Sequence, residues 1–187
     1  MPDGRFHILF VCTANICRSP MAERVAAAQL TGPFSVSSAG TRGHHGDEMH
    51  PYAAETLVSL GVAPDGFRAR QLDASQVAGA DLILTATRKH RSAVVSLDPT
   101  SLGRAFTIPQ FARLVAASEP VARTGDPVER AREVVREAVR ARATLQPVDQ
   151  ELDEIADPYG HPREEFAACA ALLEDTLRPT LAVIAAE

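Results

Sequence analysis

The chain has 187 residues, and 45% of them are hydrophobic, which is enough to build one buried core and argues against a disordered protein. Its net charge of -5 and sequence pI near 5.7 give no general electrostatic reason for binding to nucleic acid or to an acidic membrane surface. Any attraction for anions must therefore be local.

Export and membrane insertion are not indicated. No apolar run approaches the roughly 20 residues that a membrane-spanning helix needs, and the apolar segment 6–11 is too short for the core of a signal peptide. The three cysteines, Cys12, Cys17 and Cys169, are an odd number and lack the paired spacing of a disulfide framework or a zinc ribbon. These features predict a cytoplasmic protein with reduced thiols.

The first predicted elements are a strand and a helix joined by a short loop. Residues 6–11 are apolar and bounded by polar or turn-forming residues, as in a strand that is buried on both faces. From Ser19 to about Leu30, apolar residues recur at helical spacing, with Ser19 predicted as the N-cap and Pro20 as the first helical residue. The loop 13–18 connects the two.

The same alternation continues along the chain. Strands are predicted over 34–37, 81–86 and 105–108, and helices over 52–60, closed by Gly61, and over 88–97. Alternating strands and helices predict an α/β fold, with a parallel sheet that has helices on both faces.

The character of the sequence changes between 112 and 146. Asp126 and Pro127 can start a helix, and the Glu-, Arg-, Ala- and Val-rich residues 128–145 predict a surface helix whose charges form a solvated face with scattered ion pairs rather than a nucleic-acid patch. A last helix is predicted over 163–184, with Pro179 kinking it or ending its first part.

The segment from Cys12 to Arg18 carries the predicted chemistry. A strand that delivers Cys12 into a short loop, followed at once by a helix, aims backbone N–H groups and the positive end of a helix dipole at one point. The same field stabilises a thiolate, so Cys12 is a candidate nucleophile. Arg18 can curl back and bind two phosphoryl oxygens with its planar guanidinium. Without further motifs, an ordinary turn with an incidental buried cysteine remains an alternative.

Two other loop residues have predicted supporting roles. Ser19 can donate its hydroxyl to the Cys12 sulfur, which stabilises the thiolate both as nucleophile and as leaving group. Asn15 can bind neighbouring backbone groups, and it tolerates the positive φ that a tightly curled loop requires.

Residues 11–23, Val-Cys-Thr-Ala-Asn-Ile-Cys-Arg-Ser-Pro-Met-Ala-Glu, resemble the signature of the low-molecular-weight protein tyrosine phosphatases. The resemblance continues in Ser-Ala-Gly-Thr at 38–41, Asp-Leu-Ile-Leu at 81–84 and Asp-Pro-Tyr-Gly at 157–160, in the family's order. The resemblance covers most of the chain, which is expected to form a single domain spanning 1–187. The exception is a helical insertion at about 116–146, where the chain is longer than the family usually is.

The resemblance implies a four-stranded parallel sheet flanked by helices, with a phosphate-binding loop after the first strand. It also implies hydrolysis of a phosphotyrosine protein or a small aryl phosphate through a phosphocysteine intermediate, with inorganic phosphate as product. Cys12 and Arg18 are then catalytic and Asp157 is the general acid. The residues expected to bind phosphate or support the loop are Thr13, Ala14, Asn15, Ile16, Cys17 and Ser19.

No cofactor or metal is expected, because Arg18, the loop amides and the helix dipole already neutralise the phosphoryl group. The adjacent His44 and His45 lack further clustered ligands. No nucleic-acid or membrane partner is expected, and the chain should be a monomer or a weak dimer.

The sequence departs from the family in the loop and in the cleft wall. Ala14 stands where the family most often has glycine. The wall position that is often a large aromatic residue is Gly43 or His44 here. Tyr159 should still offer one aromatic wall, with a partly buried packing role as the alternative.

Cys17, the second cysteine of the loop, has two alternative roles. The resemblance suggests that Cys17 can trap oxidised Cys12 as a reversible disulfide; otherwise Cys17 is a packing thiol. Cys169 is expected in the core.

Two other functions compete with the phosphatase. A thiol-dependent arsenate reductase has a similar loop but relays oxidation through mid-chain cysteines, and none lies between Cys17 and Cys169. A non-catalytic phosphate- or phosphoprotein-binding module would need neither a nucleophile nor an acid.

Overall fold

The computed structural model describes residues 4–121 and 125–185. Its four strands form one parallel sheet in the order β2-β1-β3-β4. The strands are β1 Phe6–Cys12, β2 Phe34–Gly40, β3 Leu82–Thr85 and β4 Ala105–Thr107. This architecture confirms the predicted α/β fold with a four-stranded parallel sheet.

The central strand β1 is buried on both faces, as its apolar sequence predicted. Ile8 and Phe10 belong to one hydrophobic cluster, and the intervening Leu9 and Val11 belong to another. Side chains alternate across a strand, so the two clusters lie on opposite faces of the sheet. Cys12 continues the Ile8 and Phe10 series and faces the larger cluster.

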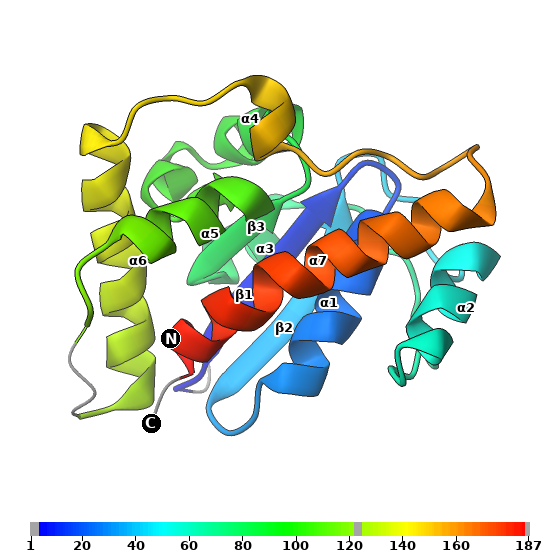
Figure 1. Cartoon of the computed structure of the whole chain (residues 1–187), viewed down its shortest axis with the longest axis horizontal. Helices are drawn as coiled ribbons and strands as arrows, with labels where there is room; N and C mark the ends of the chain where they lie inside the picture. The colour runs from blue at the N-terminus through cyan, green and yellow to red at the C-terminus, as the bar shows by residue number, and fades with distance from the viewer. Residues whose placement is uncertain (1–3, 122–124, 186–187) are drawn as a thin grey trace.

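Helices cover both faces, and the larger cluster lies beneath most of them. It contains side chains of α1 Arg18–Gln29, α2 Pro51–Ser59, α5 Ile108–Ala117, α6 Pro127–Thr144 and α7 Arg163–Ile184. The opposite face packs against α3 Ala74–Gly79 and α4 Arg88–Leu97. Figure 1 shows α7 crossing in front of the sheet, with α6 at one edge of the molecule and α2 at the other.

Two α-helices were not predicted. The helix α3 is only six residues long and begins with a capping box made by Asp73 and Gln76. The helix α5 follows β4 without a loop, because Thr107 is both the last strand residue and the N-cap whose hydroxyl accepts from Gln110 N. The predicted strand over 105–108 therefore ends one residue early. Elsewhere Asp126 caps α6 as predicted.

The start of α1 corrects one prediction. Ser19 is not the N-cap, since the helix begins at Arg18 and its N-cap, Cys17, makes no side-chain capping hydrogen bond. The Ser19 hydroxyl instead contacts Cys12 and Asn15. At the other end of the chain α7 runs unbroken through Pro179, so the prediction that the helix can end there is wrong.

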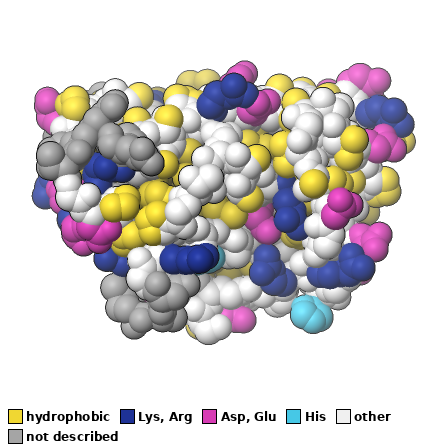
Figure 2. Space-filling view, turned by 90° about the horizontal axis from the view of Figure 1, so that it is seen from below, with side chains coloured by type: hydrophobic (Ala, Val, Ile, Leu, Met, Phe, Trp, Pro, Cys, Tyr) yellow, Lys and Arg dark blue, Asp and Glu magenta, His cyan; other side chains and the backbone are white. Residues whose placement is uncertain are grey.

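The outer face of α6 carries the predicted ion pairs. Arg136 contacts both Glu129 and Glu133, and Arg140 contacts Glu133 and Glu137. The inner face supplies buried side chains to the core, so the helix is amphipathic rather than wholly superficial. Figure 2 shows one face of the molecule, on which positive, negative and hydrophobic side chains are interspersed over the part of the chain that the structure describes.

Candidate active site

The 12–18 loop lies at the edge of the sheet where the parallel strands end. Four of its carbonyl groups accept hydrogen bonds from the segment 41–50: Cys12 O from Thr41 N, Thr13 O from Arg42 N, Ala14 O from His44 N and Ile16 O from His50 N, at 2.9 to 3.1 Å. Because a trans peptide holds C=O and N–H in opposite directions, the amides that follow these carbonyls point away from the segment 41–50. The loop therefore has several N–H groups that are turned away from this segment, and their binding of a phosphate stays a prediction.

Asn15 fixes the tightest bend of this loop. It is fully buried and is the one non-glycine residue with positive φ in the described ranges, at 60°. Its Nδ2 donates to Ser19 Oγ and Ser38 Oγ, both at 2.8 Å, and its Oδ1 accepts from Arg70 N at 2.8 Å. These three contacts hold a backbone conformation that costs a non-glycine residue energy.

The second strand approaches the loop so closely that Gly40 has no room for a side chain. A Cβ at this position would lie 2.4 Å from Thr13 O and 2.9 Å from Asn15 N. Gly40 also pairs with Cys12 in the register between β1 and β2. The predicted motif at 38–41 is thus the support on which the loop rests.

Cys12 is buried at the base of the loop, and its sulfur lies 2.9 Å from Ser19 Oγ. Because Asn15 Nδ2 donates to the same Ser19 oxygen, the Ser19 hydroxyl proton is free to point at the sulfur. With the proton in this position Cys12 is the acceptor, which is the direction that a thiolate requires. The nearby start of α1 adds the positive end of its dipole.

Arg18 and Asp157, which are distant in sequence, meet at the mouth of the loop. Arg18 Nη2 donates to Asp157 Oδ2 in a short ion pair. The Arg18 side chain is 5% exposed, whereas that of Asp157 is 46% exposed. The arginine is therefore held inside the site, and the carboxylate lies at its open edge.

A buried ion-pair cluster anchors the segment that carries Asp157. Asp153, 2% exposed, accepts from Arg88 at 2.9 Å and from Arg113 at 2.8 Å. Two residues further on, Ile155 N donates to Ala86 O at the end of the third strand, and Ile155 O accepts from Arg18. The segment is thus tied to the sheet and to the loop.

A cavity of about 220 Å³ opens above the sulfur, and nine residues line it: Cys12, Thr13, Ala14, Ile16, Cys17, Arg18, His44, Asp157 and Tyr159. Of the two wall candidates, His44 lines the cavity, whereas Gly43 packs against the Arg70 backbone. Tyr159, 59% exposed, meets the ring of His50 edge-on at 5.8 Å. Asn15 and Ser19 are not among the lining residues and support the loop from behind.

The other two cysteines are buried thiols. Burial, followed by the neighbouring Cys12, raises the pKa of Cys17 to about 12, and burial raises the pKa of Cys169 to about 12. Cys169 lies in the core, as predicted. All three cysteines are free, and the disulfide between Cys12 and Cys17 stays a prediction.

Several supporting residues were not predicted from the sequence. Glu23 accepts from Ser38 and Arg70 behind Asn15, and His90 reaches Thr13 from the start of α4. The position of His90 offered a signal, because it follows the buried 81–86 strand and side chains at the carboxyl ends of parallel strands meet at one edge of a sheet.

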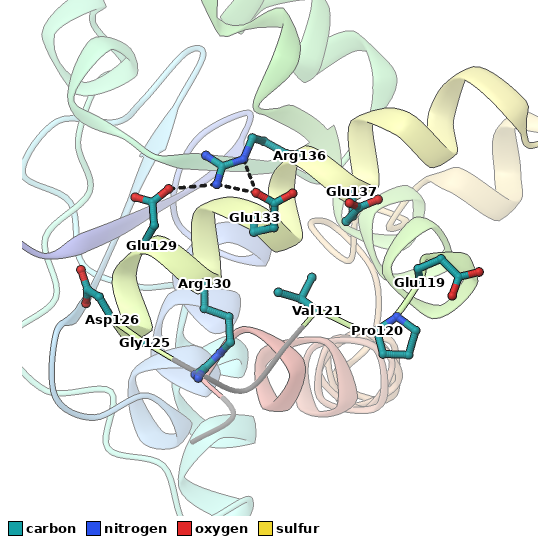
Figure 3. Close-up of a pocket in the computed structure, with 10 residues that line it drawn as sticks. All are labelled: Glu119, Pro120, Val121, Gly125, Asp126, Glu129, Arg130, Glu133, Arg136 and Glu137. Atoms are coloured by element: carbon teal, nitrogen blue, oxygen red, sulfur yellow. Dashed lines mark hydrogen bonds and ion pairs between the residues drawn. The ribbon is translucent and has the colours of Figure 1, made fainter.

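Another hollow, larger than the cavity above the Cys12 sulfur, lies elsewhere. It has a volume of about 530 Å³ and lies between α6 and the chain that follows α5. Figure 3 shows its walls, where Glu129 and Glu133 hold Arg136 and where Glu119, Asp126 and Glu137 add further acids. Five carboxylates against two arginines disfavour a phosphate monoester, so size does not identify the site.

The described ranges hold neither a cluster of metal ligands nor a membrane-spanning helix. Residues 4–121 and 125–185 contain no group of three or more His, Cys, Asp or Glu side chains that could hold a metal ion. Within the same ranges, no helix is both long and apolar enough to cross a membrane.

Known proteins resemble this chain in sequence and fold. The family model for low molecular weight phosphotyrosine protein phosphatases matches residues 7–147. A Streptomyces coelicolor low molecular weight protein-tyrosine-phosphatase is 30% identical over 185 residues, which are 96% of this chain and 93% of the relative. The solved Erwinia amylovora tyrosine phosphatase AmsI has a TM-score of 0.69 at 26% identity, covering 94% of this chain and 90% of that one. The Geobacillus stearothermophilus arginine phosphatase YwlE has a TM-score of 0.69 at 28% identity, covering 95% and 90%. This chain therefore belongs to the low molecular weight phosphotyrosine protein phosphatase family, as a cysteine-dependent enzyme.

Proposed function

We propose that the chain hydrolyses aryl phosphate monoesters, with phosphotyrosine on proteins as the substrate class, and that Cys12 is the nucleophile. The observation that carries this proposal is the Ser19 hydroxyl 2.9 Å from the Cys12 sulfur, in a loop whose carbonyl groups are bound on the side of the segment 41–50. A sulfur held in this way is stabilised as an anion, both before attack and when it leaves.

The loop amides and Arg18 are proposed to bind the three non-bridging phosphoryl oxygens. The amides are held by carbonyl groups that are engaged on the outside of the loop, so they need not reorganise when charge develops. Arg18 supplies a planar pair of donors at the opposite side. These groups supply the charge stabilisation for which other phosphatases use metal ions.

Asp157 is proposed to move the proton in both steps. In the first, a Cys12 S–P bond forms, the P–O bond to the aryl group breaks, and the departing phenolate takes the Asp157 proton. In the second, water attacks the phosphocysteine, Asp157 takes a proton from that water, and the S–P bond breaks to release phosphate and the thiolate. The family match ends at residue 147, so this role is supported by the position of Asp157 at the cavity edge.

The cavity walls favour an aryl group over a guanidino group. Ile16 and Tyr159 offer apolar and aromatic surface beside the loop, whereas Asp157 is the one carboxylate that lines the cavity. A phosphorylated arginine would bring a guanidino group that needs acceptors, and a phenyl ring needs none. The similarity to YwlE makes phosphoarginine the necessary comparison substrate.

The test measures hydrolysis of phosphotyrosine and phosphoarginine peptides in the presence of EDTA. We expect turnover of the phosphotyrosine peptide, a trapped phosphocysteine at Cys12 on acid quench, and a loss of turnover of at least about 10,000-fold in Cys12→Ser. The matched control is Cys169→Ser, which removes a thiol that does not line the cavity. Turnover that survives Cys12→Ser would remove the nucleophile, and a clear preference for phosphoarginine would overturn the substrate class.

We further propose that residues 1–187 form one catalytic domain in which 116–146 lies outside the site. None of the residues lining the 220 Å³ cavity comes from this segment. Deletion is not a clean test, because α6 supplies buried side chains to the core. Point substitutions within α6 can separate its contribution to stability from any contribution to catalysis.

A further inference from the structure

His90 is a buried histidine with both ring nitrogens engaged beside the 12–18 loop. It lies in the first turn of α4 and is 5% exposed. Its Nε2 is 2.9 Å from Thr13 Oγ1, and its Nδ1 is 2.9 Å from Thr87 Oγ1. Thr87, the N-cap of α4, also accepts from the His90 backbone N–H at 3.3 Å. The imidazole is therefore fixed from two sides.

Thr13 connects this histidine to Arg18. The Arg18 Nη2 lies 3.3 Å from Thr13 Oγ1. A guanidinium can only donate, so the Thr13 oxygen is the acceptor in this contact. On its other side the same hydroxyl faces His90 Nε2. The position of the hydroxyl oxygen is set jointly by the arginine and the histidine.

The histidine is neutral near physiological pH. Burial, and next the positive charge of Arg18, lower the pKa of His90 to about 4, while Asp157 and Glu154 act in the opposite direction. A neutral imidazole has one donor and one acceptor nitrogen, which matches its two hydroxyl neighbours. It also adds no second positive charge next to Arg18.

The Arg18 guanidinium has two fixed contacts besides Asp157. Its Nη1 donates to Ile155 O at 3.2 Å, and its Nη2 donates to Thr13 Oγ1. Two anchored nitrogens define the plane of a rigid guanidinium. One anchor is a backbone carbonyl, and the other is a threonine hydroxyl that could rotate away if nothing held it.

We propose that His90 is a positioning residue for Arg18: it holds the Thr13 hydroxyl so that the guanidinium keeps the plane in which it meets phosphoryl oxygens. The inference rests on the proposed function only in that Arg18 binds the phosphoryl group. His90 itself is not among the residues that line the cavity.

A double-mutant cycle tests this proposal, with Thr13→Val, His90→Ala and the double variant. The first readout is the Kd for inorganic phosphate from calorimetry, and the second is kcat/KM for p-nitrophenyl phosphate. We expect each single variant to lose about tenfold in both, the size expected of one hydrogen bond to a charged group. The double variant should also lose about tenfold rather than about a hundredfold, because both substitutions break one chain of contacts.

Three controls separate positioning from a merely structural effect. Thr13→Ser keeps the hydroxyl and should recover most of the phosphate affinity that Thr13→Val loses. Ser92→Ala, on the exposed side of the same helix, should change neither readout. Imidazole ¹⁵N shifts should show His90 neutral at pH 6, and a charged ring at that pH would contradict the proposal.

The outcomes also separate this inference from the proposed function. Additive losses, or wild-type phosphate affinity in Thr13→Val, would overturn the role of His90 even if the enzyme turns over normally. Coupled losses in phosphate affinity would support the role of His90 even if no phosphotyrosine peptide were hydrolysed.

Discussion

Different forces position the 12–18 loop and α6. The loop is held by hydrogen bonds to side chains such as Asn15 and to the segment 41–50, and its conformation includes a strained positive φ. The helix α6 is held by an apolar stripe on its inner face and by surface ion pairs on its outer face. Loss of contacts should therefore reduce activity in the 12–18 loop and stability in α6.

The largest effect in the loop region, after loss of the nucleophile, is expected for the carboxylate that lies at its mouth. We predict that Asp157→Ala lowers kcat for an alkyl phosphate by about 100- to 10,000-fold, because a poor leaving group needs its proton. The loss should be smaller for p-nitrophenyl phosphate, whose leaving group needs little help. The control is Glu151→Gln, an exposed acid on the same segment. Equal losses for both substrates would show that Asp157 does not act as the acid.

Substitutions at Asn15, the strained position of the loop, can distinguish the effect of backbone conformation from that of hydrogen bonding. We predict that Asn15→Gly and Asn15→Ala both lower kcat/KM by about 10- to 100-fold, since each removes the contacts to Ser19, Ser38 and Arg70 N. Glycine adopts a positive φ without strain. If Asn15→Gly retained full activity, the conformation alone would be what Asn15 provides. Steady-state kinetics of both variants decides between these outcomes.

Substitutions on the inner face of α6 should reduce stability and leave activity unchanged. We predict that Val134→Ala lowers the free energy of unfolding by about 2 kcal/mol, because it removes buried methyl groups and leaves a cavity. Urea unfolding measures this loss, and kcat/KM should stay within twofold of the wild type. The matched control is Val139→Ala on the same helix, where the side chain is 36% exposed. A large fall in kcat/KM in the folded Val134 variant would place α6 in the active site.

The smallest effect is expected on the outer face of α6. Arg136→Ala removes pairs with Glu129 and Glu133, all of which are solvated and screened by salt. We predict a smaller change in Tm than for Val134→Ala, diminishing further at high salt, and unchanged turnover. A Tm loss that exceeds that of Val134→Ala would show that this charge network, rather than the apolar stripe, holds the helix.

The predictive power of the sequence differed between these regions for a physical reason. In the loop, every functional residue from Cys12 to Ser19 is local, so a short motif contains the thiol, the arginine and the serine together. In the second half of the chain, α5 was missed because Thr107 ends a strand and caps a helix at once, with no loop to mark the boundary. Ser19 was misread as a cap, because its side chain has a better partner in the Cys12 sulfur.

The sequence by itself determined the parallel α/β fold, the loop and its candidate nucleophile, because apolar periodicity and a local motif are properties of neighbouring residues. Only the tertiary structure decided that Asp157 meets Arg18, that His44 rather than Gly43 lines the cavity, and that His90 reaches Thr13. These partners come from segments far apart in the chain. Their meeting depends on how the carboxyl ends of parallel strands converge, which no local pattern records.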